Sequence, residues 1–249
     1  MHVLQDQVAI ITGASAGIGR ATARLFAAEG AAVVLNARTE GPLQELAAQI
    51  RSEGGAASVV AGDVALPQVH EQLVHAALRD FGGLDIAVNN AGATGPSRQL
   101  ADLSDTEWRH VLDVNLTAAF FGARSQIPAM LERRGGSIIF TSSFVGTSAG
   151  LAGMAAYGAA KAGLGGLVKG ITADYAARGI RANAVLSGGV DTALAGDDAQ
   201  KAWAAGLHAL KRIARPAEIA QAMLFLAGPM SSFIAGSAMY VDGGNAAVK

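Results

Sequence analysis

Short, continuous apolar runs alternate along the chain with segments whose apolar residues recur every three or four positions. Such runs are typical of parallel strands buried on both faces, and the recurring spacing is typical of helices that cover a sheet. The apolar runs predict strands over residues 8–11, 32–35, 57–61, 86–88, 137–141, 181–186 and 238–241. The recurring spacing predicts helices over residues 20–29, 39–52, 67–81, 104–130, 154–178 and 216–226.

This regular alternation predicts an α/β fold, a single doubly wound parallel sheet with helices on both faces. No change in composition marks a linker, so we expect residues 1–249 to form a single domain. Residues 187–210 are the least regular stretch and are rich in Gly, Ala and Asp. We expect this stretch to be a mobile lid or substrate loop.

Composition narrows the possible functions. The net charge of −1 argues against nucleic acid or an anionic membrane as a partner, and the absence of cysteine excludes disulfides and thiolate catalysis. The chain begins without a signal peptide and has no apolar run that could span a bilayer, so we expect a cytoplasmic protein. Five histidines lack metal-ligand spacing, and we expect them to be surface or structural residues with no metal site: His2, His70, His75, His110 and His208.

A glycine-rich turn separates the first predicted strand from the first predicted helix. Gly13, Gly17 and Gly19 follow the spacing G-x-x-x-G-x-G. Glycines allow a backbone to approach a pyrophosphate closely, and the N-terminus of the following helix offers free N–H groups and a positive dipole end. The same glycines could mark only a tight turn, but their place in a βαβ unit favours dinucleotide binding.

The end of the second strand indicates which dinucleotide is bound. An acidic residue there binds the ribose 2′-hydroxyl of NAD, whereas a basic residue accommodates the 2′-phosphate of NADP. The sequence has Arg38 at this place and no carboxylate before Glu40. We therefore expect a preference for NADP(H). NAD(H) remains the alternative, in which Arg38 lies in solvent at the edge of the sheet.

Tyr157 and Lys161 are four residues apart in a predicted helix and so share one of its faces. A nearby cation favours the phenolate and lowers the pKa of a tyrosine, which would suit Tyr157 to act as a general acid/base near neutral pH. The alternative is an ordinary surface contact between the two side chains.

With these residues assembled, the chain resembles the classical short-chain dehydrogenases/reductases over essentially its whole length. Several separate motifs carry the resemblance and occur in the family's order. They are Thr12–Gly19, Asp63–Val64, Asn89–Gly92, Asn115, Ser143, Tyr157 with Lys161, and Tyr240–Gly244.

The resemblance implies a Rossmann-type fold and a hydride transfer between a nicotinamide ring and a carbonyl or hydroxyl carbon. It assigns proton donation to Tyr157 and orientation of the reacting oxygen to Ser143. It implies that Lys161 binds the nicotinamide ribose and lowers the Tyr157 pKa. It also implies that Asn115 supports a water that passes protons to Lys161. Ser142 and Ser143 follow the predicted fifth strand, where either could be a simple turn residue.

The resemblance also implies a set of cofactor-binding residues: Gly13, Ser15, Gly17, Ile18, Gly19, Arg38, Asp63, Val64, Asn89, Ala91, Gly92, Tyr157, Lys161, Val190 and Thr192. Two positions depart from the family pattern. Ser187 replaces the usual proline, which frees its φ angle and predicts a more mobile loop over the nicotinamide. Ala16 stands where some NADP-preferring members carry a basic residue, so the preference depends on Arg38.

We therefore expect an NADP(H)-dependent carbonyl reductase or alcohol dehydrogenase, similar to 3-oxoacyl-carrier-protein reductases. The alternative from another class is a protein that senses the dinucleotide without catalysis. Residues 93–100, 145–154 and 190–210 are expected to form an apolar pocket for an uncharged or partly hydrophobic small molecule. The resemblance further suggests a homotetramer built through the two long helices and the C-terminal segment.

Overall fold

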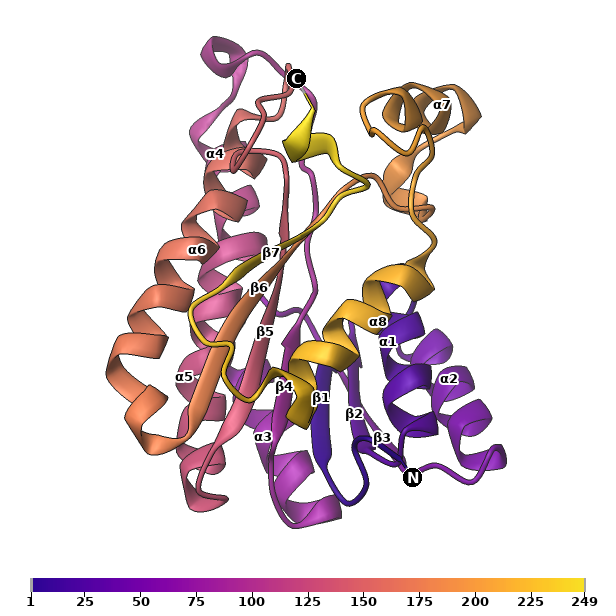
Figure 1. The fold of residues 1–249 in the computed structure, drawn as a ribbon, viewed down its shortest axis with the longest axis vertical. Helices are drawn as coiled ribbons and strands as arrows, with labels where there is room; N and C mark the ends of the chain where they lie inside the picture. The colour runs from indigo at the N-terminus through magenta and orange to yellow at the C-terminus, as the bar shows by residue number, and fades with distance from the viewer. Residues whose placement is uncertain (1, 249) are drawn as a thin grey trace.

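Seven parallel strands form one sheet in the computed structural model, which describes residues 2–248 (Figure 1). The strand order is β3-β2-β1-β4-β5-β6-β7, and every neighbouring pair is parallel. The predicted parallel α/β sheet is confirmed. The strands are β1 Val8–Thr12, β2 Ala32–Ala37, β3 Ala57–Ala61, β4 Ile86–Asn89, β5 Gly136–Ser143, β6 Ile180–Ser187 and β7 Ala238–Val241.

Helices cover both faces of this sheet. They are α1 Gly17–Ala28, α2 Glu40–Ser52, α3 Pro67–Phe81, α4 Asp105–Leu112, α5 Ala118–Glu132, α6 Ala155–Tyr175, α7 Asp198–Gly206 and α8 Pro216–Ala227. One buried cluster joins α1, α2 and α8 to the sheet through residues such as Phe26 and Met223. A second joins α3, α5 and α6 to the opposite face through residues such as Leu73 and Leu164. No helix within residues 2–248 is both long and apolar enough to cross a membrane.

The helix predicted over residues 104–130 is divided by a π-helical segment, Asp113–Thr117. It begins as predicted, because Ser104 and Glu107 form a reciprocal capping box. The Asn115 amide then donates a hydrogen bond of 2.9 Å to the carbonyl oxygen of Val111, within the helix itself. An Asn side chain that competes with the backbone in this way favours an irregular turn, which the apolar spacing does not reveal.

Two further predictions are corrected at the carboxyl ends of the strands. Ser142 and Ser143 are the last residues of β5 rather than turn residues, because Ser143 pairs with Ser187 of β6. The irregular stretch 187–210 contains α7, whose start is capped reciprocally by Asp197 and Gln200. Tertiary pairing overrides the local signal at the serines, whereas the Asp197–Gln200 capping box starts a helix within the irregular stretch.

The order of the strands determines where a ligand can bind. The chain runs outward from β1 through β2 to β3, and then returns to place β4 on the other side of β1. Ligands of doubly wound sheets bind at such a switch point, outside the carboxyl ends of the strands. All the motifs singled out above follow strands at this edge or lie on helices beside it.

Candidate functional site

The turns after β1 and β6 lie side by side at the switch point. A Cβ added to Gly17 would lie only 2.8 Å from Cγ2 of Thr192. Two predicted cofactor residues that are far apart in the sequence therefore face each other. A Cβ added to Gly19 would collide with the backbone of Gly13, so the turn closes only with glycine at position 19.

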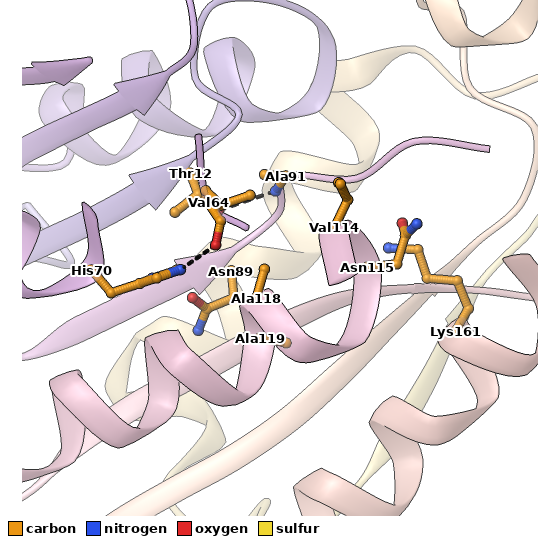
Figure 2. Close-up of a pocket in the computed structure, with 10 residues that line it drawn as sticks. All are labelled: Thr12, Val64, His70, Asn89, Ala91, Val114, Asn115, Ala118, Ala119 and Lys161. Atoms are coloured by element: carbon orange, nitrogen blue, oxygen red, sulfur yellow. Dashed lines mark hydrogen bonds between the residues drawn. The ribbon is translucent and has the colours of Figure 1, made fainter. Parts of the chain in front are cut away.

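Hydrogen bonds tie the glycine-rich turn to the segment after β4. The backbone N–H groups of Asn90 and Ala91 both donate to Oγ1 of Thr12, at 2.9 and 3.0 Å. Figure 2 shows the contact between Thr12 and Ala91. The Asn90 amide also donates to the Thr12 carbonyl oxygen at 3.0 Å. Both turns are thus held in one fixed arrangement by buried or half-buried polar groups.

The N-terminus of α1 fits the pyrophosphate of a dinucleotide. Its N-cap residue is Ala16, which supplies no side-chain cap, and its first turn contains no acidic residue. The first N–H groups of a helix without a cap need an acceptor, and the positive end of the dipole favours an anion. The glycine backbone beside them leaves room for close approach.

At the adenine end, Arg38 and Asp63 follow the neighbouring strands β2 and β3. Arg38 is exposed and forms no ion pair with the described residues, so its guanidinium is free to bind a phosphate. Asp63 accepts a hydrogen bond of 2.9 Å from the Ala65 N–H, which is the contact of an ordinary turn residue. The Asn36 amide joins the ends of the same two strands by donating to the carbonyl oxygens of Val60 and Gly62.

Lys161 and Asn115 meet beside Gly92. A Cβ added to Gly92 would lie 2.7 Å from Oδ1 of Asn115 and 3.2 Å from Nζ of Lys161. Lys161 is buried and donates a hydrogen bond of 2.7 Å to the carbonyl oxygen of Thr141. Asn115 is held by the backbone of Ala93, donating to its carbonyl oxygen at 2.8 Å and accepting from its N–H at 3.2 Å.

A small polar cavity of about 10 Å³ lies next to this pair. Figure 2 shows Lys161 and Asn115 at one end of the cavity and His70 at the other, with Asn89 between them. A polar cavity of this size suits one water molecule. The proton-passing water that the family resemblance implies stays a prediction for this position.

Tyr157 and Ser143 lie close together against an apolar cluster. Tyr157 packs in this cluster with Val111, Phe144 and Val145, and its side chain is nearly buried. Burial raises the pKa of Tyr157, and the neighbouring Ser143 hydroxyl opposes that increase. The Ser143 Oγ also accepts a hydrogen bond of 3.1 Å from the Val145 N–H.

The expectation that Lys161 lowers the Tyr157 pKa stays a prediction, because burial determines the direction of the shift in this structure. Burial lowers the pKa of Lys161 to about 8, which weakens it as a fixed positive charge. Its Nζ lies 5.7 Å from the centre of the Tyr157 ring. Because both groups are removed from water, the neutral form of each is favoured.

The two serines at the end of β5 have separate roles in the structure. Ser142 Oγ donates to the backbone carbonyl oxygen of Lys161 at 2.8 Å and so fixes α6 against the strand. Ser143 faces the other way, as successive residues of a strand do, and lies beside Tyr157. This arrangement favours Ser143 over Ser142 as the residue that contacts a substrate. The contact between Ser142 and α6 has no signal in the sequence.

The segment after β6 is held on several sides. The N–H of Gly188 donates to the carbonyl oxygen of Val241 at 3.1 Å, and that of Asp191 donates to Ala214 at 2.8 Å. Ser187, whose replacement of proline predicted a mobile loop, is itself paired within the sheet. Hydrogen bonds to neighbouring segments therefore oppose the expected mobility.

Within residues 2–248, no three His, Cys, Asp or Glu side chains gather in a way that could hold a metal ion.

Comparisons with known proteins agree with this geometry. Residues 13–246 match the family model described as Enoyl-(Acyl carrier protein) reductase. The chain is 38% identical to cyclohexanol dehydrogenase of Acinetobacter sp. (strain SE19), over 96% of this chain and 94% of that protein. It is 37% identical to the 3-oxoacyl-[acyl-carrier-protein] reductase FabG of Vibrio cholerae, over 97% and 98%. The crystal structure of a short-chain type dehydrogenase/reductase from Mycobacterium marinum superposes with a TM-score of 0.94 at 33% identity, covering 98% of this chain and 97% of that one.

Proposed function

Because the chain belongs to the short-chain dehydrogenase/reductase family and is an oxidoreductase of its alcohol and ketone type, we propose that it transfers a hydride between NADP(H) and a carbonyl compound or secondary alcohol. The observation that carries the proposal is the meeting of Tyr157, Ser143 and Lys161 beside a glycine-rich turn and an uncapped helix N-terminus. A hydride donor, a proton donor and an oriented carbonyl oxygen can all be accommodated there.

Tyr157 acts in this proposal as the general acid/base. Its raised pKa keeps the phenol protonated at neutral pH, so it can donate a proton to the oxygen of a carbonyl group that is being reduced. The Ser143 hydroxyl donates a hydrogen bond to the same oxygen and fixes its position, stabilising the negative charge that develops there. Lys161 and Asn115, which both line the small cavity, hold the proton path there in this proposal.

NADP(H) supplies the hydride when it is bound. Its pyrophosphate would lie on the N–H groups of the glycine-rich turn from Gly13 to Gly19, and its ribose hydroxyls would face Lys161. Thr192, beside Gly17, would close the site over the pyrophosphate. The exposed Arg38 supports NADP(H) over NAD(H), because a guanidinium can bind the 2′-phosphate in a bidentate manner.

The proposed substrate is an apolar ketone or the corresponding secondary alcohol. Leu194 and Trp203 stand exposed on the segment above the site, and Leu151 and Met154 pack against the Tyr157 cluster. A cyclic alcohol, the substrate class in the name of the Acinetobacter relative, suits such a lining. A 3-oxoacyl thioester, suggested by the Vibrio relative, is the second candidate.

We further propose a cytoplasmic homotetramer. Phe120 on α5 is 45% exposed and Phe233, before β7, is fully exposed, which suits the expected interfaces through the long helices and the C-terminal segment. Analytical ultracentrifugation of the purified protein would test the assembly. A monomer at micromolar concentration would contradict it.

An activity panel tests the proposed reaction. Purified protein is mixed with NADPH or NADH and with cyclic ketones, linear ketones, aldehydes and 3-oxoacyl thioesters, and the loss of reduced nicotinamide is followed. We expect oxidation of NADPH with cyclic ketones. Tight dinucleotide binding without turnover on any carbonyl compound would instead favour the sensing function.

A further inference from the structure

A buried histidine supports the loop that follows β6. His208 is only 2% exposed, and its Nε2 lies 3.0 Å from the backbone nitrogen of Gly189. A backbone N–H can only donate, so Nε2 must accept with its lone pair. The imidazole is therefore neutral and carries its proton on Nδ1, a tautomer that the contact itself dictates.

Among the described residues, the hydrogen bond from the Gly189 N–H is the one polar contact of the imidazole. Nδ1 is buried and has no hydrogen-bond partner there. The ring also packs against Phe144 in a T-shaped arrangement, at 6.0 Å between ring centres. Phe144 follows Ser143 directly and belongs to the Tyr157 cluster. His208 thus joins the loop after β6 to the wall that supports the proposed catalytic residues.

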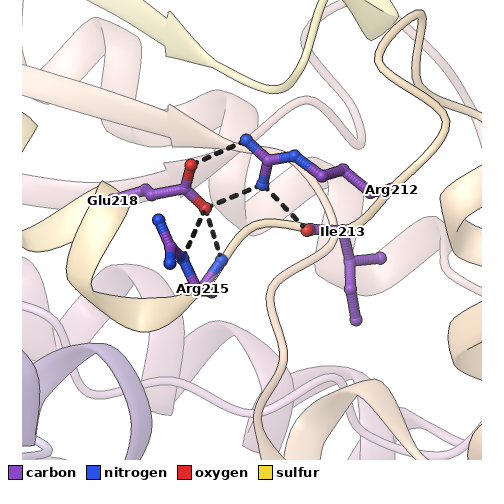
Figure 3. Close-up of polar contacts among 4 residues, drawn as sticks. All are labelled: Arg212, Ile213, Arg215 and Glu218. Carbon is purple, nitrogen blue, oxygen red and sulfur yellow. Dashed lines mark hydrogen bonds and ion pairs between the residues drawn. The ribbon is translucent and has the colours of Figure 1, made fainter.

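The charged groups near His208 are engaged elsewhere. A cavity of about 220 Å³ beside the ring is also lined by Arg212, Glu218 and Asp242. Figure 3 shows Arg212 bound to both oxygens of Glu218, at 2.7 and 2.8 Å, with the Arg215 N–H donating to the same carboxylate. Asp242 accepts hydrogen bonds from the N–H groups of Gly244 and Ala246. Among residues 2–248, the carboxylates that line this cavity are therefore engaged with partners other than the imidazole.

The loop and the ring fit each other closely. A Cβ added to Gly188 would lie 2.6 Å from Cε1 of His208, and one added to Gly189 would lie 3.1 Å from Nε2. Only a backbone without side chains can pass over the imidazole at this distance. The segment that carries His208 is fixed in turn, because the Asn245 amide donates to the Leu207 carbonyl oxygen at 2.7 Å.

We propose that His208 is a positioning residue for hydride transfer. By accepting the Gly189 N–H, it holds the loop through Val190 and Thr192 over the end of the cleft where the nicotinamide is expected. This role depends on the proposed function. It also gives the Ser187 loop a restraint that the family's proline would otherwise provide through its fixed φ angle.

Hydrogen–deuterium exchange of the protein without added dinucleotide tests the restraint apart from any activity. In His208→Leu, which has similar bulk but no acceptor, we expect exchange of peptides covering residues 187–192 to rise about tenfold, as the loss of one buried hydrogen bond implies. His208→Gln keeps an acceptor oxygen and should restore most of the protection. Exchange in His208→Leu equal to that of the unmodified protein would overturn the proposal.

His70 provides the matched control. It is also 2% exposed, and its Nε2 contacts a backbone group, the Val64 carbonyl oxygen at 2.8 Å, at the adenine end of the cleft. His70→Leu should leave exchange at residues 187–192 unchanged. An equal increase in both variants would mean that loss of any buried imidazole loosens the protein, and would overturn a specific role for His208.

Kinetics and NMR complete the test. His208→Leu should lower kcat about tenfold while the Kd for NADPH changes less than about twofold, since the glycine-rich turn and Arg38, which are proposed to bind the phosphates, lie outside this loop. Should that variant fail to fold, the imidazole 15N shifts of the unmodified protein decide: an Nδ1–H tautomer at neutral pH supports the proposal, and an Nε2–H or charged ring overturns it. If loop exchange responds as expected but the unmodified protein turns over no carbonyl compound, hydride transfer fails while the restraint stands.

Discussion

The two sides of the cleft are built differently. On the β1–β4 side, buried polar side chains such as Thr12 lock the turns to one another, and a helix N-terminus is fixed behind them. On the β6–β7 side, α7 and the turn before it carry apolar side chains that remain exposed, among them Trp203 at 59% on α7 and Leu194 at 57% in the turn. The first side is suited to bind the same cofactor in every turnover. The second is free to accommodate different substrates.

This difference implies that substitutions on the two sides separate in their effects. Changes on the β1–β4 side should alter cofactor binding or chemistry for every substrate. Changes on the α7 side should alter the KM for particular substrates and leave dinucleotide binding intact.

The largest effect is expected from Tyr157→Phe. Removing the phenolic oxygen deletes the proton donor from a nearly buried position and leaves the ring packing unchanged, so kcat should fall about 10³-fold. NADPH binding, followed by fluorescence titration, should change less than about twofold. Near-normal turnover would remove Tyr157 from the proposed mechanism.

Lys161→Met should remove a pH dependence of stability. In the unmodified protein without dinucleotide, the Lys161 pKa falls from 10.5 in the unfolded chain to about 8 in the folded one. Between these values the unfolded state binds more protons, so the free energy of unfolding rises with pH, by up to about 3 kcal/mol for this shift. Urea unfolding at pH 7.5 and pH 10 measures this change.

The quantity to compare is the rise in the free energy of unfolding with pH in the unmodified protein and in Lys161→Met. The contribution of every other titrating group cancels in the difference between the two proteins. We expect the rise to be smaller in Lys161→Met by up to that amount. Parallel pH profiles of the two proteins would show that Lys161 is not a buried, shifted base.

Arg38→Asp tests the end of the cleft where the adenine ribose is expected, after β2. Losing a charge-assisted contact to the 2′-phosphate and adding a repelling carboxylate should weaken NADPH binding about 50-fold. NADH binding should change little or improve. Arg24→Asp on α1 is the control, because Arg24 pairs with Glu53 rather than facing the cleft. Equal weakening of both dinucleotides in Arg38→Asp would show that Arg38 does not bind the phosphate.

The smallest effect is expected from Trp203→Ala on the α7 side. Loss of an aromatic surface should raise the KM for a cyclic ketone about tenfold without altering the Kd for NADPH. Leu78→Ala, which removes an exposed apolar side chain on α3, should leave that KM unchanged. An unchanged KM in Trp203→Ala would place substrate recognition elsewhere.

Much of the fold follows from the sequence because each element carries its own local signal. The bounds of β3, α3 and β7 agree with the apolar pattern, and the Ser104 capping box marks the start of α4. The helix α7 was missed although Asp197 and Gln200 have capping-box spacing, a signal that was available in the sequence. The extension of β5 to Ser143 depends on its pairing with β6, which no local pattern contains.

Some features of the candidate site could likewise be predicted from the sequence, and others could not. The motifs place Tyr157, Lys161 and Ser143 correctly at one end of the sheet, since residue spacing determines which strand or helix each occupies. The direction of the Tyr157 pKa could not be predicted, because it depends on burial from every side. His208 gave no signal either. A lone histidine is ordinary in a sequence, and its contact with Gly189 exists only in the folded chain.

Isotope transfer tests the central claim most directly. The protein is incubated with a cyclic ketone and NADPH that carries deuterium at the hydride position of the nicotinamide, prepared separately for each face of the ring. Hydride transfer predicts an alcohol with one deuterium on its carbinol carbon from one of the two forms and none from the other. An alcohol without deuterium from both forms, or bound NADPH with no alcohol formed from any ketone tested, would contradict the assignment.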